Sequence, residues 1–120
     1  MAELADVKKA RVTVDINGVD YELIPSPDAI ISLSTKYDGL APLMAALGRM
    51  NVLAMADTVI AGLGLEGAKA RDMLKAVASS NLLDLMPKLT EFAAICSNGG
   101  RPLRSAEDAA QSQESSKNPM

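Results

Sequence analysis

Residues 11–24 read RVTVDINGVDYELI, and this stretch decides the fold because it has the pattern of a β-hairpin. Apolar and polar residues alternate on both sides of Asn17-Gly18, the strongest short turn signal, since a type I′ turn needs positive φ at both central positions. A two-residue turn predicts three apolar pairs, which are Ile16 with Val19, Val14 with Tyr21 and Val12 with Leu23. All six side chains then share one face, which must be buried because a two-stranded ribbon is marginal alone.

The rest of the chain supplies only helices. Apolar spacing predicts helical segments at about 27–37, 40–50, 52–63, 66–78 and 82–96. Asn51 is expected either to cap the third helix or to lie inside a longer one, and we favour a break near Met50. Pro87 is expected to kink the last helix or to split it, because proline removes one backbone hydrogen bond. The predicted fold class is α+β, mostly α: an N-terminal two-stranded antiparallel hairpin followed by a bundle of four or five short helices.

Composition limits the core and the domain organisation. The 120 residues suffice for one domain, and the only aromatic residues are Tyr21, Tyr37 and Phe92, so aliphatic side chains and methionine must fill the core. Residues 1–10 are predicted to be a flexible lead-in, and 11–97 the hairpin plus helical domain. Residues 98–120 are polar and predicted to be a flexible tail, in which 105–113 could become helical against a partner.

Several kinds of chemistry lack the residues that they need. The sequence has no histidine and one cysteine, which removes the commonest general base and any zinc ligand set. We therefore expect no catalytic residue, metal or cofactor. Cys96 lies in an apolar helical pattern and is interpreted as a buried hydrophobic residue. The strongest carboxylate candidates, Asp15, Asp20 and Glu22, belong to the polar face of the hairpin, where solvation explains them.

Charge and hydropathy limit the partners. The net charge is −3, and the cations are scattered apart from Lys8, Lys9 and Arg11, so no nucleic-acid partner is expected. A terminal cluster of this size is typical of a solvated arm. No segment has the pattern of a signal peptide or the length of a membrane span, so no membrane partner is expected. Together with the single cysteine, this predicts a soluble protein of a reducing cytoplasm.

Apolar residues are too many for one small core to cover, which predicts association with another protein or with further copies of this chain. The candidate partner-binding or oligomerisation residues lie on or beside the apolar stripes of the helices. They are Met44, Leu47, Met50, Leu53, Met55, Ile60, Leu83, Met86 and Ile95. The exposed side of the hairpin is a second candidate, as an edge contact between subunits. It carries Thr13, Asp15, Asp20 and Glu22.

The order of these parts resembles the tail assembly chaperones of long-tailed bacteriophages and related proteins of gene transfer agents. The resemblance rests on the Asn-Gly hairpin, the Pro-Ser-Pro-Asp helix start at 25–28 and Leu-Ala-Pro-Leu-Met-Ala-Ala-Leu at 40–47. It continues with Ile-Ala-Gly-Leu-Gly at 60–64 and covers about 11–96. It is a pattern of lengths and small apolar residues, so it assigns no individual binding residue.

The resemblance implies a non-catalytic chaperone of the host cytoplasm. Such proteins self-associate and coat the long, apolar, helical tape measure protein until tail tube subunits displace them. Many have a longer, frameshifted form, and Ser116-Lys117-Asn118 is compatible with a slippery codon run.

Two other functions are weighed beside the chaperone. One is a small adaptor or antitoxin-like module that sequesters one specific protein at a fixed ratio. The other is a DNA-binding helix-turn-helix within 40–63, which is disfavoured because its second helix carries Asp57 and no cation.

Overall fold

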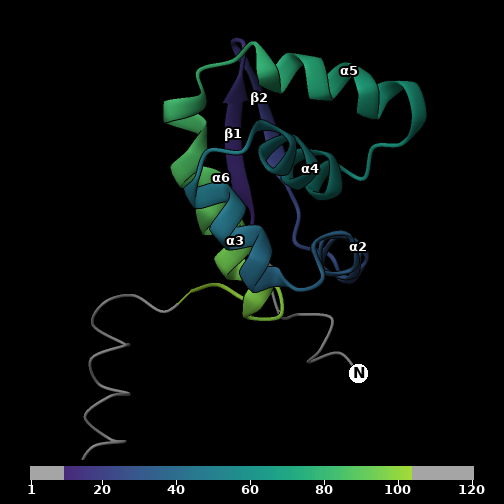
Figure 1. Cartoon of the computed structure of the whole chain (residues 1–120), viewed down its shortest axis with the longest axis vertical. Coiled ribbons are helices and arrows are strands. Elements are labelled where there is room, and N and C mark those ends of the chain that lie inside the picture. The colour runs from purple at the N-terminus through teal and green to yellow at the C-terminus, as the bar shows by residue number, and fades with distance from the viewer. Residues whose placement is uncertain (1–9, 104–120) are drawn as a thin grey trace, which may run out of the picture.

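The computed structural model describes residues 10–103 and begins with the predicted hairpin (Figure 1). Strand β1 (Val12–Ile16) pairs antiparallel with β2 (Val19–Leu23) in the predicted register. The turn residues Asn17 and Gly18 have φ values of 55° and 86°, as a type I′ turn requires.

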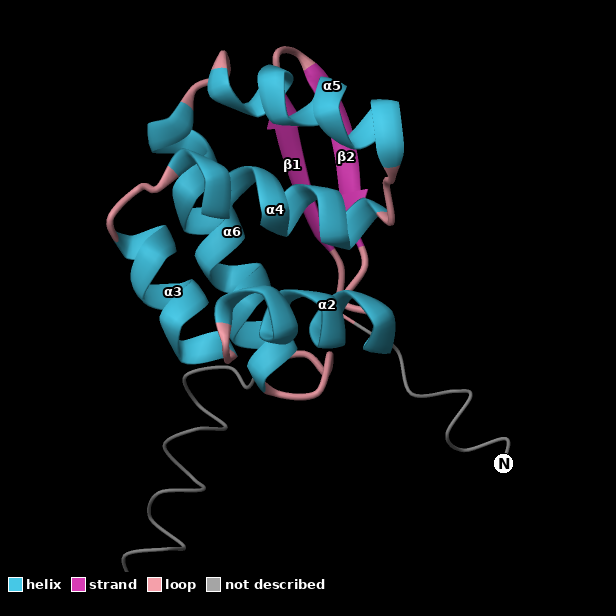
Figure 2. Ribbon diagram, turned by 45° about the vertical axis from the view of Figure 1, so that its right-hand side comes forward, coloured by secondary structure: helices cyan, strands magenta, loops and turns pink. Residues whose placement is uncertain are grey.

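Five helices follow, so the predicted fold class is confirmed (Figure 2). They are α2 (Pro27–Tyr37), α3 (Leu40–Gly48), α4 (Val52–Leu63), α5 (Gly67–Ala78) and α6 (Leu82–Ser97). The break near Met50 is confirmed, because Met50 has a positive φ of 57° and Asn51 caps α4. The cap is a hydrogen bond of 3.0 Å, which the Ala54 N–H donates to Asn51 Oδ1.

Helix α6 runs through Pro87 as one helix, so of the two outcomes expected at this proline the split is excluded. Proline cannot donate to the carbonyl of the residue four positions earlier, which is Leu83. Leu83 lies in the exposed first turn, where water can reach that carbonyl. The interruption is therefore tolerated close to the start of the helix.

Helix α4 is the centre of the molecule and packs against β2, α2, α3, α5 and α6. Every residue from 54 to 59 is buried. Asp57 and Thr58 lie off the apolar stripe in the sequence, yet both are buried, because neighbours surround the helix on all sides. The Thr58 hydroxyl donates to the Ala54 carbonyl at 2.8 Å, which satisfies its hydrogen-bonding need within the helix.

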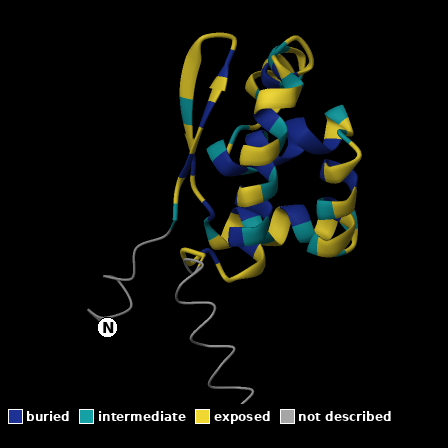
Figure 3. Ribbon diagram, turned by 90° about the vertical axis from the view of Figure 1, so that its left-hand side faces the viewer, coloured by how far each residue is buried: buried dark blue, intermediate teal, exposed yellow. Residues whose placement is uncertain are grey.

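The apolar face of the hairpin is only partly covered (Figure 3). Val12, Val14 and Ile16 of β1 are buried, and so is Leu23 at the end of β2. In contrast, Val19 is 50% exposed and Tyr21 is half-buried. The expectation that all six residues would be buried was therefore wrong for these two. Helix α6 packs against β1 and α4 packs against β2, but the tip half of β2 stays partly exposed.

Strand β2 and helix α4 approach each other closely at Gly62. A Cβ atom at this position would lie 2.8 Å from Leu23 Cβ and 3.3 Å from Leu23 Cα. The Ile24 N–H donates to the Gly62 carbonyl at 3.0 Å, which ties the end of the hairpin to the helix. Glycine is required here because any side chain would push the two elements apart.

The folded unit extends slightly beyond the predicted limits of 11–97. The Ala10 N–H donates to the Gly100 carbonyl at 3.2 Å, and Gly100 is buried. Residue 10 and residues 98–100 thus belong to the domain and not to the lead-in or the tail. The predicted flexibility of 1–9, the basic residues Lys8 and Lys9, the tail helix at 105–113 and the frameshift residues 116–118 lie outside the described residues.

Candidate functional site

Three of the nine candidate contact residues belong to the core. Leu47 and Met55 have no exposed surface, and Ile95 is 2% exposed. Their prediction as contact residues was wrong, because each lies on a helix that is covered on both sides of its apolar stripe. Sequence periodicity identifies apolar positions but does not distinguish those that face the core from those at its margin.

The other six candidates reach the surface to different extents. Met44, Met50, Ile60 and Met86 are half-buried against the core. Leu53 is 51% exposed and Leu83 is 72% exposed. Leu53 lies in the first turn of α4, and Leu83 lies in the first turn of α6.

The predicted edge residues of the hairpin are all exposed, on its outer face. Asp15 and Asp20 lie directly opposite each other, which is an unfavourable like-charge pair. Asp15 Oδ1 accepts a hydrogen bond of 2.8 Å from the Gly18 N–H, and Glu22 forms an ion pair of 3.1 Å with Arg11. Their role as a joint between subunits stays a prediction.

An apolar groove lies where the hairpin face is left open. It has a volume of about 390 Å³ and is bounded by β2, the end of α4 and one face of α5. We name it the β2–α5 groove. Its apolar lining residues are Tyr21, Leu63, Leu65, Met73 and Ala76, and its charged lining residues are Lys69 and Asp72.

Helix α5 positions the far wall of this groove. It is tied to the hairpin tip by Asn17, whose Nδ2 donates to the Ala76 carbonyl at 3.1 Å and to Ser79 Oγ at 3.2 Å. Its inward residues Met73 and Val77 are buried. The helix is thereby held over the tip of β2 at one end, and the groove stays open beside it.

None of the groove residues was among the predicted site residues. Lys69 and Asp72 are charged residues of α5, and Tyr21 was assigned to the buried hairpin face. A signal was present in the sequence, because α5 is the least apolar of the five described helices and therefore covers the hairpin least completely. A groove with an apolar floor and charged margins suits an apolar side chain presented by a partner.

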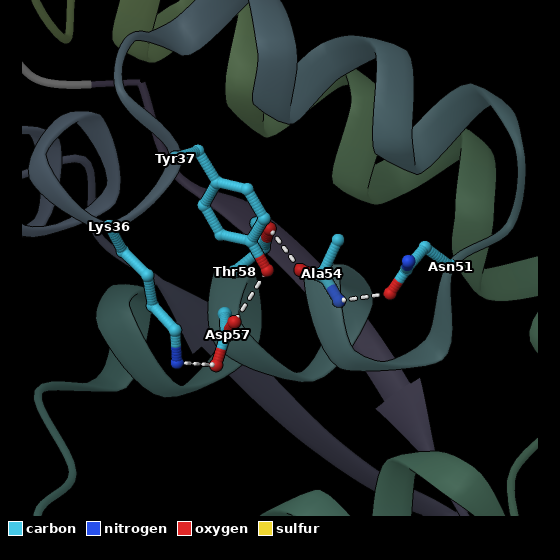
Figure 4. Close-up of polar contacts among 6 residues, drawn as sticks. All are labelled: Lys36, Tyr37, Asn51, Ala54, Asp57 and Thr58. Carbon is cyan, nitrogen blue, oxygen red and sulfur yellow. Dashed lines mark hydrogen bonds and ion pairs between the residues drawn. The ribbon is translucent and has the colours of Figure 1, made fainter.

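Asp57 is the centre of a polar cluster that links α2 to α4 (Figure 4). Its Oδ1 accepts a hydrogen bond of 2.9 Å from Lys36 Nζ, and its Oδ2 accepts one of 2.5 Å from the Tyr37 hydroxyl. Burial, together with the adjacent Asp57 carboxylate, raises the pKa of Tyr37 well above its ordinary value. The phenol therefore stays protonated and remains a donor.

A cleft of about 420 Å³ opens beside this cluster, between α2 and the end of α4. Its polar lining includes Asp28, Ser32, Lys36, Asp57 and Glu66. Both oxygens of Asp57 already accept hydrogen bonds, so the carboxylate clamps α2 against α4. Among residues 10–103, no three His, Cys, Asp or Glu side chains gather where they could hold a metal ion.

Cys96 is 2% exposed, and burial raises the pKa of its thiol to about 11 from an ordinary 9.0. A raised pKa means that the native state holds this proton more tightly than the unfolded chain. The protonated thiol thus makes its full contribution to stability below about pH 9, and this contribution is lost as the pH rises to 11. We expect urea denaturation to show that the free energy of unfolding decreases by up to about 2 kcal/mol between pH 9 and 11.

The matched variant for this pH prediction is Cys96→Ala. It should be less stable than the natural chain at pH 8, because it leaves a small cavity, but it should lose less stability between pH 9 and 11. Tyr37 contributes in the same direction above pH 10 in both proteins. An equal decrease in both proteins would show that the thiol is not the titrating group.

No family model, curated protein or solved structure matches the chain. Within residues 10–103, the helices are all too short or too polar to cross a membrane.

Proposed function

We propose that this protein is a phage tail assembly chaperone, which binds apolar helical segments of a tape measure protein and keeps them soluble until tail tube subunits displace it. The observation that carries the proposal is the β2–α5 groove, an open apolar surface beside the part of the hairpin's apolar face that is not fully buried. The resemblance of residues 11–96 to this class of chaperone supports the same function.

The groove fits a helical client of variable sequence. Its floor combines Tyr21, Leu65 and Met73, and methionine adapts to side chains of different shape. A partner helix that presents apolar residues at positions i, i+3 and i+4 could place one or two of them in the groove. Lys69 and Asp72 at the margin carry opposite charges, so the groove favours neither a positively nor a negatively charged client.

A single groove of this size gives only weak binding, which suits a chaperone that must be displaced without any chemical step. A tape measure protein presents many similar apolar stretches along its length. Several copies bound side by side would therefore coat it through many weak contacts, provided that the copies also associate with one another.

The test uses the purified full chain and a fragment of a tape measure protein encoded in the same genome. Light scattering should show that the fragment aggregates alone and stays soluble with the chain. With Ala76→Glu, the same protection should require a chain concentration at least about tenfold higher. The new side chain would occupy the groove and bring a charge to its apolar lining.

Ala68→Glu is the matched control, since Ala68 is an exposed residue of α5 outside the groove. It should protect as well as the natural chain does. If Ala76→Glu protected as well as the natural chain, the client would have to bind outside the groove. A natural chain that ignores the fragment altogether would overturn the proposed function.

A further inference from the structure

Strand β2 has an outer edge that no other strand covers within residues 10–103, because the sheet there contains only β1 and β2. The turn type determines which backbone groups lie at this edge. In a hairpin with a two-residue turn, the residues next to the turn exchange hydrogen bonds across the strands, and every second residue does so thereafter. In β2 these residues are Val19 and Tyr21. The N–H and C=O groups of Asp20 and Glu22 therefore point away from β1.

The contact between Ile24 and α4 agrees with this direction. Alternate residues of a strand point their N–H groups to the same edge, and Ile24 belongs to the same series as Asp20 and Glu22. Its N–H donates outside the hairpin, to the Gly62 carbonyl at 3.0 Å. Within residues 10–103, no backbone hydrogen bond joins Asp20 or Glu22 to a segment outside the hairpin. In this part of the chain, the edge thus offers two N–H donors and two C=O acceptors.

The β2–α5 groove lies beside this edge. Gly62 is bonded to the edge of β2, and the next residue of α4, Leu63, lines the groove. Figure 2 shows the connection between α4 and α5 on the β2 side of the hairpin, away from β1. Tyr21 also lines the groove, and Val19 on the same face of β2 is 50% exposed. A strand added to this edge would place every second side chain over the groove.

The opposite face of the hairpin carries negative charge along the same edge. Asp20 lies opposite Asp15, and neither takes part in an ion pair among residues 10–103. Glu22 pairs with Arg11, but both side chains of that pair are more than half exposed. Like charges directly opposite each other are destabilising, and a cation on a neighbouring strand would offset them. The edge therefore favours a strand that brings cations to this face.

We propose that the outer edge of β2 binds an extended segment of another protein in which apolar and cationic residues alternate. The segment adds a third, antiparallel strand to the hairpin. Its main chain pairs with Asp20 and Glu22, and its apolar side chains enter the β2–α5 groove beside Tyr21. Its lysine or arginine side chains lie against the two carboxylates. In such strand addition the main-chain hydrogen bonds supply affinity, and the sites for alternate side chains supply specificity.

The occupant is a strand of another protein and not a second copy of this edge, because the edge is negatively charged. Two β2 edges placed together would bring Asp20 and Glu22 of one copy against the same residues of the other, which is repulsive. The inference goes beyond the proposed function, since the ligand is a strand and not a client helix. Both ligands place apolar side chains in the groove, so they exclude each other, and this exclusion rests on the proposed function.

Fluorescence anisotropy of a labelled peptide with the full chain tests the contact. The probe is the capped peptide Ser-Lys-Val-Lys-Val-Lys-Ser, which has the proposed alternation. The natural chain should bind it. Replacing its valines with serine, or its lysines with glutamate, should raise the dissociation constant at least about tenfold, because the groove or the carboxylates then lose their partner.

Asp20→Lys should reverse the charge preference, so that the glutamate peptide binds more tightly than the lysine peptide. The hairpin should be retained, because this change also removes the repulsion between Asp20 and Asp15. Glu91→Lys is the matched control, since it makes the same kind of change at an exposed residue of α6. It should prefer the lysine peptide as the natural chain does.

Methylation of the peptide backbone tests the binding mode. In an antiparallel strand on this edge, the N–H groups of the lysines face β2 and those of the valines face away. N-methylation of the lysines should therefore raise the dissociation constant at least about tenfold, whereas N-methylation of the valines should leave it unchanged. Absence of binding, equal effects of the two methylations, or an unchanged charge preference in Asp20→Lys would overturn the proposal.

These experiments separate the added strand from the proposed function. Protection of the tape measure fragment by a chain that does not bind the peptide would reject the added strand and retain the chaperone. Binding of the peptide in the expected manner, without protection of the fragment, would reject the chaperone and retain the added strand. A second copy held at the edge would give a dimer that does not bind the peptide, which would also overturn the added strand.

Discussion

Met55→Asp is expected to abolish folding of the domain. Met55 lies in the middle of α4 with no exposed surface, and α4 packs against β2, α2, α3, α5 and α6. A carboxylate there would be buried without a partner, and its desolvation would cost about 4 kcal/mol or more. This is comparable to the whole stability of many small domains. Circular dichroism of the purified variant should show loss of helical signal and no cooperative thermal transition.

Leu83→Asp is the control for that experiment, because it makes the same kind of change at an apolar residue that is 72% exposed. Its stability, measured as a monomer at low concentration, should lie within about 0.5 kcal/mol of the natural chain. A carboxylate in the first turn of α6 is also favourable with respect to the helix dipole. A folded Met55→Asp variant would contradict the central position of α4.

The contrast between Met55 and Leu83 shows what sequence alone can predict about the surface. Both residues are apolar and lie in helices, and both were predicted as contact residues. Periodicity defines a stripe on each helix, but whether neighbours cover one side or all sides depends on the tertiary packing. The central position of α4, which buries even Asp57 and Thr58, is indicated only in part by its own sequence, in which these two are the only polar residues.

The hairpin was predictable in register and turn type because both follow from local rules. Asn17-Gly18 determines the turn, and a two-residue turn determines every cross-strand pair. The extent of its burial was not predictable in the same way. It depends on where α5 lies, and α5 is positioned by long-range contacts such as that of Asn17 with the Ala76 carbonyl. The β2–α5 groove is thus a consequence of packing that no single segment encodes.

The helix ends were also largely predictable, because Ser26 and Asn51 cap α2 and α4 through their own side chains. The polar cluster of Lys36, Tyr37 and Asp57 was missed. A buried carboxylate in an otherwise apolar helix is a signal that its partners must come from elsewhere in the chain. The sequence does not identify those partners, since the last turn of α2 is one of several segments with a cation.

Gly62→Ala is expected to destabilise the domain by about 2 kcal/mol. Alanine is a better helix former than glycine by about 1 kcal/mol, so an uncrowded site in α4 would gain stability from the change. At Gly62 the added Cβ would lie 2.8 Å from Leu23 Cβ and 3.3 Å from the backbone at Leu23 Cα. Strand β2 would have to move away from α4, which would also strain the hydrogen bond between Ile24 and Gly62.

Gly48→Ala provides the matched control, because Gly48 is also helical and a Cβ atom there would have no neighbour within 4 Å. It should gain up to about 1 kcal/mol, so the two substitutions are expected to act in opposite directions. Urea denaturation of both variants measures the difference. If both glycine variants gained stability alike, β2 would not be packed on α4 at Leu23. The position of β2 beside the β2–α5 groove would then lack its support.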